Sequence, residues 1–166
     1  MRKTYRICLI GILILSTAGC DQFTKTIAKA KLASTEPVVL LDNLIRLEYA
    51  ENSGAFLSIG EHLPSPVILF LTSLLTAIII LIIARLSFQN QKVKQSLIIG
   101  LALIAGGSIG NLIDRLLNAG VVVDFMNVGI GQIRSGIFNV ADIAILAGVF
   151  ILIVFMGRNP NKTNSV

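Results

Sequence analysis

The chain has 166 residues, of which 54% are hydrophobic and only 14% are charged. A soluble domain of this size carries about 25% charged residues, so the composition excludes an ordinary water-facing surface. The net charge of +5 would suit a nucleic-acid partner, but the bases lie beside long apolar blocks and the chain has no tryptophan. The single histidine, His62, excludes sites that need two imidazole ligands. The sequence therefore predicts an integral membrane protein that does not bind nucleic acid.

Four apolar blocks approach the length of about 20 helical residues that a hydrocarbon core requires. In chain order, the predicted spans cover about residues 5–24, 66–86, 97–113 and 136–157. Residues 34–65 carry β-branched and aromatic residues broken by turn signals, which predicts a short hairpin or small sheet outside the membrane. Because no repeat or linker is present, we expect residues 1–166 to form a single domain of membrane α-helical class.

Charge gives these spans an orientation. The N-terminus, the segment between the second and third spans, and the C-terminal tail carry bases and no acid. All nine acidic residues lie on the opposite side. Because basic flanks favour the cytoplasm, the sequence predicts that both termini are cytoplasmic and that the acidic side faces outward.

The N-terminal segment also resembles the signal peptide of a bacterial lipoprotein. A basic start, a short apolar stretch and small residues precede Cys20. Three further spans follow, which a lipidated soluble protein would not have, so we assign residues 1–20 to the first span. The alternative is a membrane-anchored structural lipoprotein whose mature chain begins at a lipidated Cys20.

Polar residues gather at the outer ends of the predicted spans, where ionisable groups are costly and tend to be functional. Asn111, Asp114 and Arg115 stand at i, i+3 and i+4 on one helical face at the end of the third span. Asn139 and Asp142 share a face at the start of the fourth span.

Two carboxyl groups on this outer side have apolar neighbours. Asp124 lies between valines and a phenylalanine, Asp142 lies in the fourth span, and neither has a base within four residues. If the two converge, one keeps a proton near neutral pH, because adjacent carboxylates do not both ionise easily. The ionised member can then take a proton from water while the protonated member polarises a peptide carbonyl. That is the chemistry of an aspartyl peptidase.

Structural interpretations remain open for the other charges. Asp114 and Arg115 could form an ion pair, and Asp21 and Lys25, at i and i+4, could form a pair at the end of a helix.

Two other functions are also considered. Gly106 to Gly110 match the G-x-S-x-G motif of serine hydrolases through Ser108, but that motif needs a strand, a turn and a helix. A small transporter or ion-conducting subunit could use Asp114 and Asp142 as relay groups. A path across the membrane needs polar groups at several depths, whereas those in this sequence gather at one end.

Five segments of the chain together resemble the lipoprotein signal peptidase (signal peptidase II) family of bacterial membrane aspartyl peptidases. They are D-Q-x-T-K after the first span, N-x-G-A-F in the outer region, G-N-x-x-D-R after the third span, V-V-D-F, and F-N-x-A-D at the start of the fourth span. Many members read N-x-G-A-A-F, so this chain is one alanine shorter there. The resemblance covers nearly the whole chain and implies four transmembrane helices with a small extracytoplasmic β-cradle.

The resemblance also implies roles for individual residues. The catalytic aspartates of the family match Asp124 and Asp142. The residues matched to substrate binding or support of the dyad are Asn52, Gly54, Asn111, Arg115 and Asn139. Structural support near the site is implied for Asp21 and Lys25, and we add Asp114.

The family acts on prolipoproteins whose cysteine already carries diacylglycerol, and it cuts the bond before that cysteine. The resemblance therefore implies this substrate, contact with membrane lipid, inhibition by globomycin, and a place in the bacterial cytoplasmic (inner) membrane. Neither a metal nor a cofactor is expected.

Overall fold

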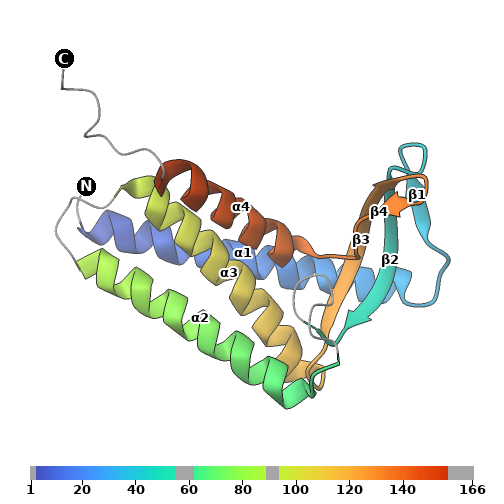
Figure 1. The fold of residues 1–166 in the computed structure, drawn as a ribbon, viewed down its shortest axis with the longest axis horizontal. Coiled ribbons are helices and arrows are strands. Elements are labelled where there is room, and N and C mark those ends of the chain that lie inside the picture. The colour runs from blue at the N-terminus through green and yellow to red at the C-terminus, as the bar shows by residue number, and fades with distance from the viewer. Residues whose placement is uncertain (1–2, 55–61, 89–93, 157–166) are drawn as a thin grey trace.

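The computed structural model describes residues 3–54, 62–88 and 94–156. Its helices and strands, in chain order, are α1 (Lys3–Leu32), β1 (Val38–Leu40), β2 (Ile45–Asn52), α2 (Ser65–Phe88), α3 (Gln95–Leu117), β3 (Val122–Ile130), β4 (Ile133–Arg134) and α4 (Val140–Met156). The four helices run side by side, and the strands lie together at one end of the bundle (Figure 1).

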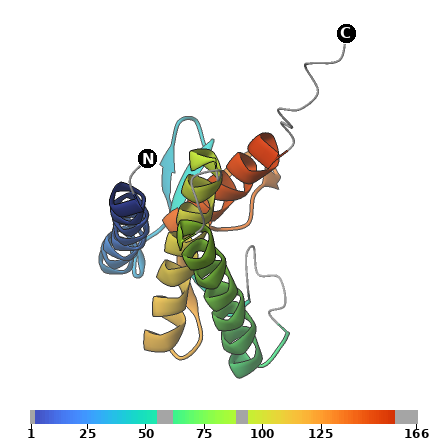
Figure 2. The same ribbon diagram turned by 90° about the vertical axis from the view of Figure 1, so that its left-hand side faces the viewer.

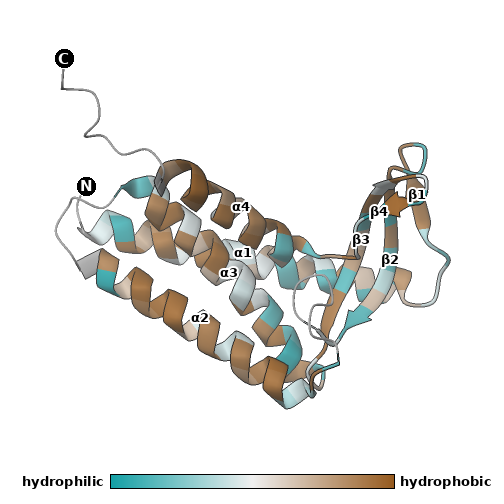
Figure 3. Cartoon of the chain, viewed as in Figure 1, coloured by the Kyte–Doolittle hydropathy of each residue, from teal (hydrophilic) through white to brown (hydrophobic). Residues whose placement is uncertain are grey.

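The helices have the length and composition of membrane spans. Within α1, α2 and α3, the stretches Thr4–Leu32, Ser65–Leu86 and Gln95–Leu117 are long and apolar enough to cross a membrane, and α4 contains a shorter apolar stretch, Val140–Phe155. Hydrophobic residues cover most of the helix surfaces, while hydrophilic residues gather where the helices approach the sheet (Figure 3).

The helix α3 is the centre of the bundle and packs against α1, α2 and α4. Seen from the end away from the sheet, α1 and α4 lie on opposite sides of the bundle (Figure 2). Glycines allow α3 and α4 to approach closely. A Cβ atom on Gly100 would lie 2.9 Å from the Gly148 carbonyl oxygen, and one on Gly107 would lie 2.5 Å from that of Ala141. Ile98 of α3 has no exposed surface at all.

The sheet is antiparallel with the strand order β1-β2-β3-β4. The hairpin expected in residues 34–65 is present as β1 and β2. The other half of the sheet comes from residues 122–134, which sequence analysis did not assign to strands. In the β2–β3 register, Asn52 pairs with Val122 and Ala50 with Asp124. This pairing joins two segments that are far apart in the sequence and brings both to the end of the helix bundle where the sheet lies.

Three helix boundaries differ by four residues or more from the predicted span limits, and one of them is the end of α3, at Leu117 rather than residue 113. The helix α1 continues past residue 24 to Leu32, because its last two turns have a buried side, which includes Ala28, and line an apolar groove of about 260 Å³ with Leu47 and Phe125 of the sheet. The helix α4 begins at Val140 rather than near residue 136, because Phe138 forms a β-bridge with Met126.

Candidate active site

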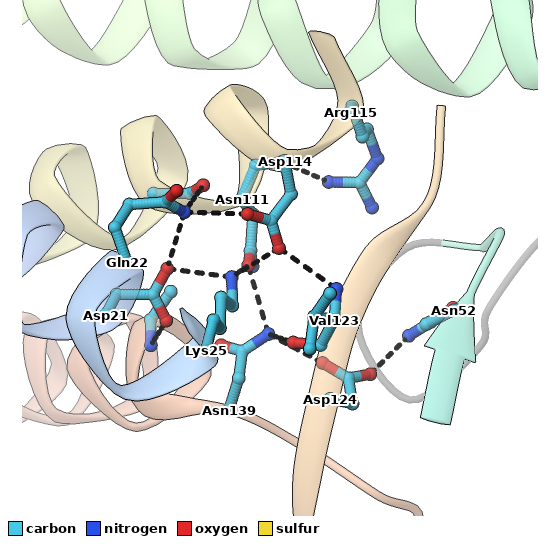
Figure 4. A network of polar contacts seen from close by, with 12 residues as sticks. Asp21, Gln22, Lys25, Asn52, Asn111, Asp114, Arg115, Val123, Asp124 and Asn139 are labelled. Carbon is cyan, nitrogen blue, oxygen red and sulfur yellow. Dashed lines mark hydrogen bonds and ion pairs between the residues drawn. The ribbon is translucent and has the colours of Figure 1, made fainter. Parts of the chain in front are cut away.

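In the structure, the carboxyl groups of Asp124 and Asp142 both accept hydrogen bonds from Asn139. Asp124 lies on β3 and Asp142 in the first turn of α4, and their exposed fractions are 2% and 3%. The side-chain Nδ2 of Asn139 donates to Asp124 Oδ1 at 2.6 Å, and the backbone N–H of Asn139 donates to Asp142 Oδ2 at 3.2 Å. Figure 4 shows Asp124 with Asn52 on one side and Asn139 on the other. The two carboxyl groups that the sequence singled out are therefore neighbours around one buried asparagine.

Asn139 and Asp142 also cap the helix that carries them. Asn139 immediately precedes α4, and its Oδ1 accepts a hydrogen bond from the backbone N–H of Asp142 at 3.0 Å. The Asp142 carboxylate accepts the reciprocal bond from the Asn139 N–H. This is the pattern of a capping box, in which residues at the N-cap and N3 positions satisfy each other's free N–H groups. The start of α4 therefore fixes the position of the Asp142 carboxyl group.

Asn52 holds the other side of Asp124. Its Nδ2 donates to Asp124 Oδ2 at 2.9 Å, and its Oδ1 accepts from the backbone N–H of Gly54 at 2.9 Å. Because a backbone N–H can only donate, the Gly54 contact determines which end of the Asn52 amide faces Asp124.

Asn111 makes the equivalent contact with Asp142. Its Nδ2 donates to Asp142 Oδ1 at 3.0 Å, while its Oδ1 accepts from Lys25 Nζ at 2.8 Å. Three asparagines thus have an oxygen held by a donor, and each points its NH₂ group at a carboxylate of the pair.

Lys25 forms two salt bridges with carboxylates of the described residues. It is 3% exposed, and its ammonium lies 2.7 Å from Asp21 and 3.0 Å from Asp114. The pair between Asp21 and Lys25 considered from the sequence is therefore present. Asp114 pairs with Lys25 across the bundle and not with Arg115, because neighbouring residues on a helix do not face each other.

Asp21 links α1 to the first turn of α4. Its Oδ1 accepts the backbone N–H of Ala141 at 2.9 Å, and the Asp21 side chain is fully buried. Gly110 of α3 makes room for it, because a Cβ atom there would lie 2.6 Å from Asp21 Oδ2. The Asp21 carboxylate therefore explains why the first residue of the G-N-x-x-D-R segment is a glycine: a side chain at this position would clash with it.

Asp114 anchors the strand that carries Asp124. Its Oδ2 accepts the backbone N–H of Val123 at 2.9 Å, and its Oδ1 accepts from Gln22 Nε2 at 2.7 Å. Gln22 also donates to the carbonyl oxygen of Gly110 at 3.0 Å. Gln22 stands in the D-Q-x-T-K segment, but no role was predicted for it. The available signal was a long polar side chain beside Asp21 at the end of an apolar helix.

Arg115 of α3 contacts the backbone at Gly54, two residues after Asn52. Arg115 is 5% exposed, and its Nη2 donates to the carbonyl oxygen of Gly54 at 2.7 Å. Its Nη1 donates to the Asn111 carbonyl oxygen at 3.3 Å. In the described part of the chain, Arg115 Nε has no hydrogen-bond partner. Residues 55–56, which complete the N-x-G-A-F segment, lie outside the described residues.

The environment of Asp124 raises its pKa from 3.8 to about 6. Burial is the largest cause, and the charge of Asp142 raises the pKa further. Hydrogen bonds from Asn52 and Asn139 and the charge of Lys25 act in the opposite direction. A carboxyl group with such a pKa can exchange a proton near neutral pH. Among the described residues, no group of three or more histidine, cysteine or acidic side chains is arranged to hold a metal ion.

Comparison with known proteins shows which family the chain resembles. The family described as "Signal peptidase (SPase) II" matches residues 13–158. A protein of Chlorobium phaeovibrioides named lipoprotein signal peptidase is 40% identical over 164 residues, which cover 92% of this chain and 93% of that protein. A protein of the same name from Halalkalibacterium halodurans is 35% identical over 158 residues, covering 95% of this chain and 94% of the relative.

A solved structure of a bacterial membrane enzyme has the same fold. It superposes with a TM-score of 0.78 at 24% identity and covers 96% of this chain and 94% of its own. A transporter or ion-conducting subunit is not favoured, because the relatives named above are peptidases over nearly their whole length. The chain belongs to the signal peptidase II family and is a membrane-embedded aspartic-type peptidase that processes lipoprotein precursors.

Proposed function

We propose that Asp124 and Asp142 are the catalytic pair of this peptidase. The observation that carries the proposal is that two buried carboxyl groups from different elements both contact Asn139. No other function considered from the sequence explains why three asparagines direct their NH₂ groups at these two side chains.

The proposed reaction uses one proton shared by the pair. The ionised carboxylate accepts a proton from water, whose oxygen attacks the carbonyl carbon of the scissile peptide bond. The protonated carboxyl gives its proton to the carbonyl oxygen, which yields a neutral tetrahedral intermediate. When the C–N bond breaks, the leaving amine takes a proton from the pair. One hydroxyl of the intermediate returns a proton to the pair, which gives the carboxylic acid product and restores the shared proton, and no covalent enzyme intermediate forms. The raised pKa of Asp124 supports this scheme, since the two groups titrate together and one proton is retained.

The asparagines and Arg115 have supporting roles in this scheme. Asn52, Asn111 and Asn139 keep the two carboxyl groups in one place. Arg115 holds the carbonyl oxygen of Gly54 and so orders the backbone beside Asn52, where we place part of the substrate-binding surface.

The substrate we propose is a prolipoprotein whose cysteine already carries diacylglycerol, cut just before that cysteine. The start of α1 and the end of α4 lie at one end of the bundle, and the sheet lies at the other (Figure 1). Since the basic segments belong to the first end, we assign it to the cytoplasm and the carboxyl pair to the outer face of the bacterial inner membrane. A lipid anchor in that leaflet would hold the scissile bond at the depth of the pair.

The serine alternative has no support in the fold. Ser108 lies inside α3, which runs without interruption from Gln95 to Leu117. A nucleophile elbow requires a sharp turn between a strand and a helix.

The test is cleavage of a diacylglyceryl-modified precursor by purified protein in detergent, followed by mass spectrometry of both products. We expect Asp124→Asn and Asp142→Asn each to lower the rate by about 10²-fold or more, because each removes one proton-transfer group. Asp42→Asn, which removes an exposed carboxylate, is the matched control and should retain activity. Globomycin should inhibit the wild type. Full activity in either catalytic variant, or equal cleavage of a precursor without lipid, would contradict the proposal.

A further inference from the structure

A continuous chain of contacts runs from Lys25 to Asp142 through Asn111. Lys25 Nζ donates to Asn111 Oδ1 at 2.8 Å, and Asn111 Nδ2 donates to Asp142 Oδ1 at 3.0 Å. We propose that Lys25 is a positioning residue for peptide cleavage, which acts by holding the Asn111 amide in the orientation that donates to Asp142. This inference rests on the proposed catalytic role of Asp142 and goes beyond structural support by Lys25.

The orientation of the Asn111 amide is the step that Lys25 controls. An ammonium group has three donors and no acceptor, so only the oxygen end of the amide can face it. Asn139 Nδ2 donates to the same Asn111 oxygen at 3.1 Å, but it also bonds Asp124 at 2.6 Å. If the amide turned over, its oxygen would face the Asp142 carboxylate, and its NH₂ group would face a cation. Both contacts are unfavourable in a buried site.

A purely structural ion pair does not account for the geometry around Lys25. Salt bridges to Asp21 and Asp114 use two of its three N–H bonds. The third points at Asn111, whose side-chain Nδ2 donates to the Asp142 carboxylate. Because Lys25 is buried and all three protons are engaged, its ammonium has no freedom to leave Asn111. The Lys25 charge also lowers the pKa of Asp124, so its influence reaches both members of the pair.

The test is a double-mutant cycle on kcat that uses Lys25→Met and Asn111→Ala. We expect Asn111→Ala to lower kcat about tenfold or more, because it removes a hydrogen bond to a charged group. If Lys25 acts through Asn111, Lys25→Met lowers kcat in the wild-type protein but changes it less than about threefold when Asn111→Ala is already present. KM should change little. Lys29→Met, which removes an exposed cation of the same helix, is the control and should leave kcat unchanged.

Removal of Lys25 leaves the buried carboxylates of Asp21 and Asp114 without a counter-charge, so the single variant can unfold. The same cycle is therefore also run in an Asp114→Asn background, where Lys25→Met removes the ammonium after one of its carboxylate partners has been neutralised. Independent effects, with the two fold-changes multiplying in the double variant, would overturn the inference while the Asp142→Asn result still supports the dyad. A wild type that does not cleave lipid-modified precursor would instead refute the proposed function.

Discussion

Gly110→Ala tests whether Asp21 holds the start of α4 in place. The added Cβ would lie 2.6 Å from Asp21 Oδ2 and 3.1 Å from its Cγ. Asp21 has no space to yield, because it is fully buried, bonds the Ala141 N–H at 2.9 Å and pairs with Lys25 at 2.7 Å. Overpacking of this kind costs about 1–3 kcal/mol, and a lost helix cap costs about 1 kcal/mol more. We therefore expect the free energy of unfolding to fall by about 2–4 kcal/mol.

The assay is equilibrium unfolding in detergent micelles, with peptidase activity measured on the same samples. Activity should fall as well, because Ala141 adjoins Asp142 in the first turn of α4. Gly19→Ala is the matched control on α1, where a Cβ meets nothing within 4 Å. Alanine is the better helix former, so this control should lose no stability. If Gly110→Ala is as stable and active as Gly19→Ala, the role we assign to Asp21 is wrong.

Three further predictions address the site. The pKa of Asp124 is raised from 3.8 to about 6 in the folded protein, so ionisation of this carboxyl group destabilises the fold. The free energy of unfolding is therefore unaffected below pH 4 and falls by about 3 kcal/mol as the pH rises through 6. Asp124→Asn removes this loss, so the variant should gain stability relative to wild type between pH 4 and pH 7 in unfolding experiments; a difference independent of pH would contradict this. Arg115→Lys should lower kcat/KM about tenfold, since an ammonium does not reproduce the two-pronged contact with the carbonyl oxygens of Gly54 and Asn111; unchanged kinetics would refute that role. Ser108→Ala should leave cleavage unchanged, and a loss of 100-fold or more would restore the serine alternative.

The helices were predictable from the sequence because membrane spans depend on length and hydropathy, which are local properties. The strands β3 and β4 were not predicted. Residues 122–125 are buried on both faces, so the apolar-polar alternation that marks a half-exposed strand is missing. The partner strand β2 also ends 70 residues earlier in the chain, at Asn52, and no local pattern encodes such a pairing.

The residues of the candidate site were largely predictable from the sequence, but the contacts between them were not. Motif residues identified the carboxyl groups and asparagines, whereas the partner of Asp114 proved to be Lys25 on another helix. Likewise, the hydrogen bond from Ala141 to Asp21 joins residues from the first and last helices. Contacts between elements depend on how the helices cross. That crossing is set by close approaches such as Gly107 against Ala141, and a single sequence suggests which glycines allow close packing but not which residue each one meets.

The reciprocal bonds between Asn139 and Asp142 have a consequence for biosynthesis. The groups that surround Asp124 come from the first, third and last helices and from both central strands, and the final piece is supplied by the first turn of α4. If Asp124 and Asp142 are the catalytic pair, as we propose, a ribosome-bound chain that has released only the first three helices has no working reaction centre. Such an immature copy would then be inert toward neighbouring membrane proteins until α4 joins the bundle.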